Sequence, residues 1–336
     1  MADGTKIEWT DATWNPITGC SIVSPGCANC YAMKLAGTRL AHIPSRAGLT
    51  TMTKAGPVWN GQVRFNEGWL DQPLRWKRPR RIFVCAHGDL FAEGVPDEWI
   101  DKVCAVMALC PQHTFQVLTK RAARMRDYFC KDARWRNRQI VVARNQIAGV
   151  KVDFGPIPSV LPLPNVWLGV STERQPEADE RIPDLLRTPG AVRFISAEPL
   201  LGPIQLNRLM VAENVERHDG PWSLRWDALS GFRATSPYSG TENNPHLDWV
   251  ISGGESGPGA RPSNPQWFRD IRDQCRAAGV AYFHKQNGEW VSVSEVEGEG
   301  EHFTFADGRT VRHVGKKKAG RLLEGVEHNG MPRPAA

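Results

Sequence analysis

The most regular feature of the sequence is a short apolar run that ends in polar residues and recurs along the chain. These runs are rich in Val, Ile and Phe and hold few charges, which is typical of strands buried on both faces of a parallel sheet. They begin at residues 81, 114, 166, 192, 248 and 280. Stretches that favour helices lie between several of them, at residues 96–110, 177–188 and 264–279.

This alternation of strands and helices predicts an α/β fold whose units are joined by right-handed crossovers. Six or seven such units favour a partial (β/α) barrel over an open, doubly wound sheet. We expect the barrel to occupy residues 1–290, with a loop at about 14–34 and insertions at about 133–165 and 203–247. Residues 291–336 are expected to form a small C-terminal extension, with a hairpin around Asp307 and Gly308 and a basic segment, GKKKAGR.

Nearly every predicted strand ends in side chains capable of chemistry, as expected for the C-terminal rim of a barrel, where the working residues lie. These strand-end side chains are His87, Asp89, Thr119, Lys120, Arg121, Ser171, Thr172, Glu173, Ser196, Glu198, Glu255, Ser256, His284, Lys285 and Gln286.

From this set and the glycines beside it we select two groups of candidate site residues. The candidate catalytic residues are Glu198, Lys120 and Glu255. The candidate cofactor-binding residues are Ser171, Ser196, Gly253 and Gly254. A carboxylate at a strand end can orient a ligand amine or act as an acid or base, and glycine lets the backbone approach a ligand closely. The structural alternative stays open: a helix N-cap, or an ion pair of either glutamate with Lys120 or Arg121.

Three cysteines lie close together near the N-terminus. Cys20 and Cys27 are separated by six residues, and Cys27 and Cys30 by two, in a loop that also holds Gly and Pro. Backbone N–H groups in such a loop can donate to thiolate ligands. A structural zinc ion needs a fourth ligand, such as His42, whereas an iron–sulfur cubane held by three cysteines leaves one iron open. The remaining alternative is that these cysteines are small buried residues, as we expect of the other five.

Composition limits the class of protein. The chain has 336 residues, 41% of them hydrophobic, which is enough for one large domain or two ordinary ones. No apolar run approaches the roughly 20 residues that span a bilayer, and the N-terminus lacks the apolar region of a secretory signal. Eight cysteines are too few for a disulfide scaffold in a chain of this length. We therefore expect a soluble, cytoplasmic protein that does not enter a membrane.

Charge and tryptophan content bear on possible partners. The net charge is +6, and basic clusters lie at 74–81 and 315–321. These clusters suit an anionic partner such as nucleic acid, although solvated surface charge explains them equally well. Thirteen tryptophans are more than composition leads one to expect, and a minority of them can stack on bases.

The cysteine segment resembles a known family. WNP followed by GC and GCANCYA resembles the cluster loop of radical S-adenosylmethionine proteins, in particular the spore photoproduct lyase-like branch. FQVLTKRAARM, VWLGVST and SAEPL resemble later strands of that branch. Over about residues 5–330 the chain also resembles an uncharacterised phage- and bacterium-associated family, which shares the SAEPLLG and SGGESG strands and a GKKAAGRLLDG-like segment. Members of that family are often found beside a three-Cys-motif partner protein.

The resemblance implies a partial barrel with a [4Fe–4S] cluster at its rim, ligated by Cys20, Cys27 and Cys30. S-adenosylmethionine would bind the open iron, and its reductive cleavage would yield a 5′-deoxyadenosyl radical. The sequence departs from the radical-enzyme pattern in three places. The first spacing is six residues instead of three, Asn29 replaces an aromatic residue, and the Gly-Gly-Glu ending at Glu255 lies on a late strand.

The sequence is compatible with three functions. The first is a radical S-adenosylmethionine-like iron–sulfur enzyme that acts on nucleic acid. The second is a non-catalytic iron–sulfur or zinc protein that binds nucleic acid or a partner protein. The third is a metal-independent barrel enzyme, a hydrolase or a nucleotide-processing enzyme, which would use Glu198, Glu255 and Lys120.

Overall fold

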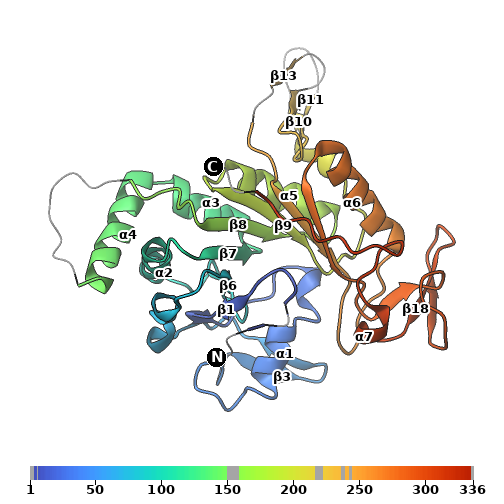
Figure 1. The fold of residues 1–336 in the computed structure, drawn as a ribbon, viewed down its shortest axis with the longest axis horizontal. Coiled ribbons are helices and arrows are strands. Elements are labelled where there is room, and N and C mark those ends of the chain that lie inside the picture. Colours follow the sequence, from blue (N-terminus) through green and yellow to red (C-terminus); the bar gives the residue numbers. More distant parts are fainter. Residues whose placement is uncertain are drawn as a thin grey trace. The chain divides into compact units, whose positions relative to one another are not determined.

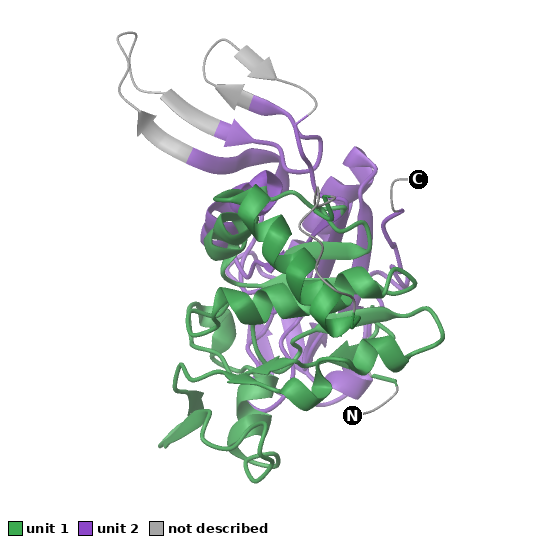
Figure 2. Cartoon of the chain, turned by 90° about the vertical axis from the view of Figure 1, so that its left-hand side faces the viewer, with its two compact units in different colours: residues 1–169, 188–191 green, residues 170–187, 192–336 purple. Residues whose placement is uncertain are grey.

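The computed structural model describes residues 4–5, 7–149, 159–215, 222–235, 239–241 and 244–333. The chain forms two compact units, which Figure 2 shows in two colours. Unit 1 holds residues 1–169 and 188–191, and unit 2 holds residues 170–187 and 192–336. Each unit is described below by itself.

Seven strands are hydrogen-bonded in an order that follows the chain (Figure 1). In that order they are β1 (Ala12–Trp14), β6 (Arg81–Val84), β7 (Thr114–Thr119), β8 (Val166–Ser171), β9 (Val192–Ala197), β14 (Trp249–Gly253) and β15 (Ala281–Gln286). The pairs β1–β6, β6–β7, β9–β14 and β14–β15 are parallel. A doubly wound sheet reverses its order at a switch point, whereas a (β/α) barrel keeps the order of the chain. The predicted α/β fold with a parallel sheet is confirmed.

The apolar runs of the sequence are the strands of this sheet. All six predicted runs form strands, and every residue of β8 and of β14 is buried. Burial of both faces explains why these strands lack the alternation of a half-exposed sheet. The short strand β1 joins the edge of β6, and no apolar run of comparable length marks it in the sequence.

Unit 1 places helices around its part of the sheet. Its helices are α1 (Tyr31–Gly37), α2 (Asp97–Leu109), α3 (Ala122–Cys130) and α4 (Ala133–Ile147), with 3-10 turns η1 (Pro25–Cys27), η2 (Glu67–Trp69) and η3 (Gln72–Arg75). Two small antiparallel pairs are β2 (Ile17–Thr18) with β5 (Arg64–Phe65) and β3 (Thr50–Thr53) with β4 (Gly56–Trp59). Acidic side chains in its first turn favour α2, which lies where residues 96–110 predicted a helix.

The segment 133–165, predicted as an insertion with a basic helix, begins with α4, which packs against α2 and α3. The Pro-rich part of that segment falls partly outside the described residues, which resume at Ser159.

Unit 2 contains two of the predicted helices. These are α5 (Gln175–Arg187) and α6 (Pro265–Ala278). Gly279 ends α6 in the left-handed conformation, with φ of 71°, which is why a glycine was needed there. α6 packs against β14 and β15.

Two further sheets belong to unit 2. One is antiparallel and comprises β10 (Leu209–Val215), β11 (Trp222–Trp226), β12 (Arg233–Thr235) and β13 (Ser239–Thr241), after the turn η4 (Leu206–Arg208). It lies in the segment 203–247, whose lack of periodicity gave no sign of strands. The other comprises β16 (Trp290–Ser292), β18 (Thr310–His313) and β17 (His302–Thr304), followed by α7 (Lys316–Ala319). β17 and β18 form the hairpin predicted around Asp307 and Gly308.

No helix in the described part of the chain has both the length and the apolar character that crossing a membrane requires.

Candidate functional site

The cysteine loop connects β2 to α1 and is shaped by backbone hydrogen bonds. The amide of Cys27 donates to the carbonyl of Ser24 at 2.9 Å, and that of Cys30 donates to Cys27 at 3.2 Å. Gly19 precedes the first cysteine with φ of 94°, and a Cβ there would lie 2.2 Å from the carbonyl oxygen of Gln62. The turn that presents Cys20 therefore requires glycine at position 19.

Two of the three thiols pack against one apolar cluster. Cys27 is buried, and the half-buried Cys20 and Cys30 pack against the same apolar cluster. The members of that cluster are Ala32, Met33, Ala36, Leu49 and Trp59. Burial raises the pKa of Cys20 to about 12 and also raises the pKa of Cys30, and the charge of Cys27 acts on both in the same direction. Cys27 is therefore close enough to influence each of the other two thiols.

Arg121 connects the cysteine loop to the end of strand β7. Its Nη1 donates to the Sγ atom of Cys20 at 3.2 Å and to Oδ2 of Asp89 at 3.1 Å. Its Nη2 donates to the carbonyl oxygen of Ser21 at 3.0 Å, and its Nε donates to Oε1 of Glu93 at 3.1 Å. Only 8% of Arg121 is exposed. A buried guanidinium with a full set of acceptors is rigidly held, so its contact with the sulfur is a fixed feature of the loop.

Asp89 fixes this arginine from the end of strand β6. Its carboxylate accepts from the hydroxyl of Thr119 at 2.7 Å and from the amide of Phe91 at 2.9 Å, besides the ion pair with Arg121. Asp89 and Thr119 are 5% and 2% exposed. Two strand ends and the cysteine loop are thus joined through buried polar contacts. Arg121 was one of the predicted strand-end side chains, and its donors are engaged by protein acceptors.

The three cysteines of the loop are side chains that can ligate a metal, but they are not arranged around a metal position. All eight cysteines of the chain are described, and none forms a disulfide. Cysteine thiolates are ligands of both iron–sulfur and zinc sites, and a guanidinium can donate a hydrogen bond to such a sulfur. Nevertheless, the described residues hold no group of three or more His, Cys, Asp or Glu side chains already arranged around a metal position. Binding would have to draw the three thiols together and deprotonate them.

A second group of predicted site residues lies at strand ends in unit 2. Glu198 follows β9, and its carboxylate accepts from Nζ of Lys285 at 2.7 and 2.9 Å and from Nε2 of Gln286 at 2.8 Å. A Cβ on Gly253 would lie 3.2 Å from the Glu198 carboxyl group. The side chains of Glu198 and Lys285 retain 16% and 17% exposure, so this pair remains within reach of solvent. The expected partners Lys120 and Arg121 are replaced here by Lys285.

Glu255 forms an ion pair with Arg261, six residues later in the sequence. Its Oε2 accepts from Nε of Arg261 at 2.8 Å and its Oε1 from Nη2 at 2.6 Å, which is a bidentate fork. Only 6% of Glu255 is exposed. Gly254 has a packing role, because a Cβ there would lie 2.0 Å from the carbonyl oxygen of Asn287. The fork on Glu255 and this close backbone approach are both contacts within unit 2.

The remaining candidates lie at the strand ends that the sequence indicated. Ser171 ends β8, and its carbonyl accepts from Nη1 of Arg181 at 2.8 Å. Ser196 lies in β9 and is 2% exposed. Lys120 follows β7 in unit 1, and its amide donates to Asp89 at 3.2 Å. The structure therefore groups Lys120 with the cysteine loop's network, and Glu198 with Gly253, in separate units.

The sequence indicated most of these residues, but it did not indicate which of them form hydrogen bonds and ion pairs with one another. The contact from Arg121 to Cys20 joins positions 101 residues apart, and no local pattern signals it. Glu93 and Arg261 follow no predicted strand directly and were not selected. Lys285 was among the strand-end residues, so the strand-end pattern could have nominated it as the partner of Glu198.

The chain belongs to a family described as "Protein of unknown function (DUF5131)", whose model matches residues 4–332. No curated protein matches the chain. No solved structure matches it either.

Proposed function

Since the family carries no assigned reaction, we propose a function from this chain's own residues: an open-site iron–sulfur protein that acts as a radical S-adenosylmethionine-like enzyme. Cys20, Cys27 and Cys30 would hold a [4Fe–4S] cluster. The observation that carries the proposal is the hydrogen bond from Arg121 to the sulfur of Cys20, made within a buried network at two strand ends. The parallel order of the strands suits the partial (β/α) barrel that this class uses.

When bound and supplied with one electron from a donor, such a cluster provides reductive cleavage of S-adenosylmethionine. The protein's own residues do the positioning. Arg121 holds the sulfur of Cys20 in place and offsets thiolate charge, and Asp89 holds Arg121. The apolar cluster of Ala32, Met33, Ala36, Leu49 and Trp59 partly shields Cys30 from water.

The strand ends of unit 2 supply polar groups for a cofactor or substrate in this proposal. Glu198 and Lys285 are partly exposed, so they can exchange their mutual contact for a ligand amine or carboxylate. The predicted roles of Ser171, Ser196, Gly253 and Gly254 in cofactor binding, and of Lys120 and Glu255 in catalysis, remain part of the proposal. The absence of disulfides among the eight cysteines suits a reducing, cytoplasmic location.

Anaerobic reconstitution with iron and sulfide tests the cluster. We expect a brown protein with about four irons per chain, and an EPR signal on reduction that changes when S-adenosylmethionine is added. Cys20→Ala should lose the cluster, and Cys130→Ala, which changes a cysteine outside the loop, should keep it. A colourless protein that binds a single zinc ion would favour the non-catalytic alternative. Activity that survives Cys20→Ala would favour the metal-independent enzyme.

A second candidate function is nucleic-acid binding, and helix α4 favours it. One groove of unit 1 is lined by Arg134, Trp135, Arg138, Leu161, Pro162 and Pro189. Trp135 is 54% exposed, and both arginines are exposed, with no described carboxylate paired to either. An exposed aromatic ring between unpaired cations suits stacking of bases and contact with phosphates.

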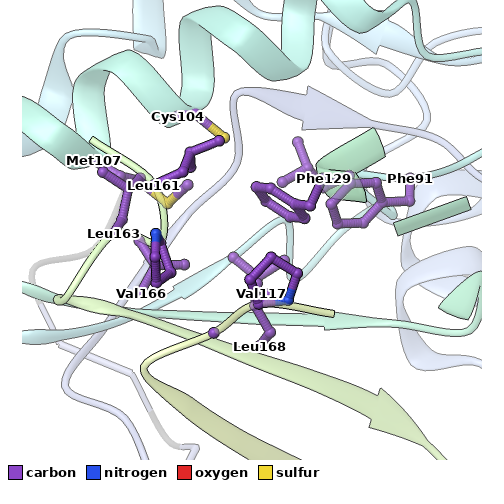
Figure 3. Close-up of a pocket in the computed structure, with 13 residues that line it drawn as sticks. Phe91, Cys104, Met107, Val117, Phe129, Leu161, Leu163, Val166 and Leu168 are labelled. Carbon is purple, nitrogen blue, oxygen red and sulfur yellow. The ribbon is translucent and has the colours of Figure 1, made fainter. Parts of the chain in front are cut away.

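The floor of this groove is apolar. The groove shares four residues with a cavity between α2, α3, β7 and β8: Phe129, Leu161, Pro162 and Pro189. Figure 3 shows the side chains that line this cavity. Cys104, Met107, Val117 and Leu168 are among the other residues that line it (Figure 3). This apolar part of the lining can contact a base without reading its hydrogen-bond groups, whereas the groove itself is also lined by the polar residues Asp132, Asn137 and Ser159.

Fluorescence anisotropy with labelled single-stranded DNA and RNA tests this second function. We expect Trp135→Ala to weaken binding about tenfold or more, through the loss of stacking. Arg134→Ala and Arg138→Ala should each reduce the salt dependence of binding. Arg144→Ala, on the same helix but hydrogen-bonded to Asn145, is the control. Equal effects of all four changes would show that the groove is not the binding site.

The proposed interaction with a three-Cys-motif partner protein is based on the family resemblance alone. Co-purification of the two proteins would test it.

A further inference from the structure

Arg46 is a buried cation of unit 1 that has no acidic partner within the residues that the structure describes. Only 5% of the residue is exposed, and no described Asp or Glu forms an ion pair with it. Its Nη1 donates to the hydroxyl of Ser45 at 2.6 Å, and its guanidinium lies 5.5 Å from the centre of the Trp69 ring. Its Nε is buried and has no hydrogen-bond partner within the described residues. A buried guanidinium stays charged, so this arrangement is costly unless an anion completes it.

His87, in the same unit, has a second atom of this kind. Its Nδ1 is buried and lacks a hydrogen-bond partner in the described part of the chain. Burial lowers the pKa of His87 to about 4, and the positive charge of Arg46 acts in the same direction. The imidazole is therefore neutral near pH 7, and its Nδ1 can carry a proton to donate. The backbone links the two positions: the hydroxyl of Thr18 donates to the carbonyl of Ser45 at 2.6 Å, and the amide of the next residue, Gly19, donates to the carbonyl of His87 at 3.2 Å.

These two side chains adjoin the cysteine loop. The amide of His87 donates to Oδ1 of Asn15 at 2.9 Å, and its carbonyl accepts from the amide of Gly19 at 3.2 Å. The ring of Tyr31, the residue after Cys30, meets the His87 ring edge-on at 5.9 Å. Tyr31 is 51% exposed and is also within electrostatic range of Arg46. One side of this group of residues thus reaches solvent.

We propose that Arg46 and Nδ1 of His87 bind an oxyanion, the phosphate or carboxylate group of a small ligand, beside the cysteine loop. Arg46 supplies the charge and a planar set of donors, and His87 supplies a directed N–H group. Tyr31 provides an aromatic surface at the solvent side for the rest of the ligand. The site does not depend on a bound cluster, because none of its groups is a thiol.

The contrast with Arg121 supports this assignment. Both arginines are buried in unit 1, yet Arg121 donates to Asp89, Glu93, Ser21 and Cys20, whereas Arg46 donates to a single serine hydroxyl. An arginine kept for structure needs internal acceptors, because otherwise its burial opposes folding. An arginine kept for a ligand can remain unpartnered, because a binding site often trades stability for function.

Thermal unfolding of the full chain, purified without reconstitution, tests the site. Inorganic phosphate and acetate would be compared with chloride at equal ionic strength and fixed pH. In the wild type we expect at least one oxyanion to raise the Tm by about 2–4 °C. A response to phosphate alone assigns a phosphate ligand, and a response to acetate assigns a carboxylate.

Variants separate this site from general salt effects. Arg46→Met should abolish the oxyanion response while leaving the Tm in chloride within about 1 °C of the wild type or above it, because an unpartnered buried charge is removed. Arg46→Lys should keep the charge but weaken the response, and Arg39→Met, an exposed arginine of the same unit, should leave it intact. The proposal is overturned if the wild type shows no response, or if Arg46→Met responds like the wild type. A large loss of Tm in Arg46→Met would assign Arg46 to structure and also overturn it.

Discussion

The two units compensate their buried charges in different ways. In unit 2 the acids at strand ends meet bases of the same unit: Glu255 with Arg261, Glu198 with Lys285, and Glu173 with Arg181. In unit 1 the network of Asp89 and Arg121 continues to a thiol, and no acid in the described part of the chain pairs with Arg46. Unit 1 also pairs Arg136 with Asp101, so the difference between the units lies in two places: the contact of Arg121 with a thiol, and Arg46, for which no described acid balances the charge.

The largest expected effect concerns the buried pair of unit 1. Arg121→Leu would leave Asp89, 5% exposed, without its cation. We expect the free energy of unfolding to fall by about 3–5 kcal/mol, because an uncompensated charge stays buried. Urea unfolding would measure this loss. The double variant Asp89→Asn with Arg121→Leu should recover part of it. A loss equal to the sum of the two single changes would show that the pair does not act as a unit.

A pH effect is expected in unit 2 from His284. This side chain is fully buried, with Nδ1 3.0 Å from Oγ of Ser252 and Nε2 3.0 Å from Oδ1 of Asn287. Burial lowers its pKa from 6.5 to about 4. The unfolded chain therefore takes up the proton first as the pH falls. The contribution of His284 is fully present above pH 6.5 and is lost between pH 6.5 and about 4.

The expected loss is about 1.4 kcal/mol per pH unit across that window. Urea unfolding at a series of pH values would show a shallower slope for His284→Gln than for the wild type. The pKa of His87 is lowered in the same direction in unit 1, so the variant should retain part of the slope. An unchanged slope in His284→Gln would mean that the imidazole is charged in the folded protein.

The smallest effect is expected at the fork of unit 2. Arg261→Leu removes both donors from Glu255, but the Arg261 side chain is 34% exposed, so water replaces part of the contact. We expect a loss of about 1–2 kcal/mol in the free energy of unfolding. Arg276→Leu, in the same unit with a side chain 75% exposed, should change stability by less than about 0.5 kcal/mol. A loss at Arg261 as large as that at Arg121 would remove the contrast between the units.

Much of the fold could be read from the sequence because its signals are local. Strands buried on both faces produce continuous apolar runs, such as that of β14. Gly279 marks the C-terminal end of α6 in the sequence. The antiparallel sheet β10–β13 gave no such signal. Of these strands, β11 alternates apolar and polar residues, with Trp222, Leu224 and Trp226 at every second position, but five residues are too short a run to predict a sheet in a segment that is otherwise irregular.

The sequence by itself determined which chemical groups are available: three cysteines in one loop, and polar side chains at the ends of successive strands. Only the tertiary structure decided how these groups are paired. It brought Arg121 to Cys20 across 101 residues and paired Glu198 with Lys285 instead of Lys120. It also left Arg46 buried with no acid among the described residues. The physical reason is that composition and period set local burial, whereas charge pairing depends on which distant strand ends become neighbours in the folded sheet.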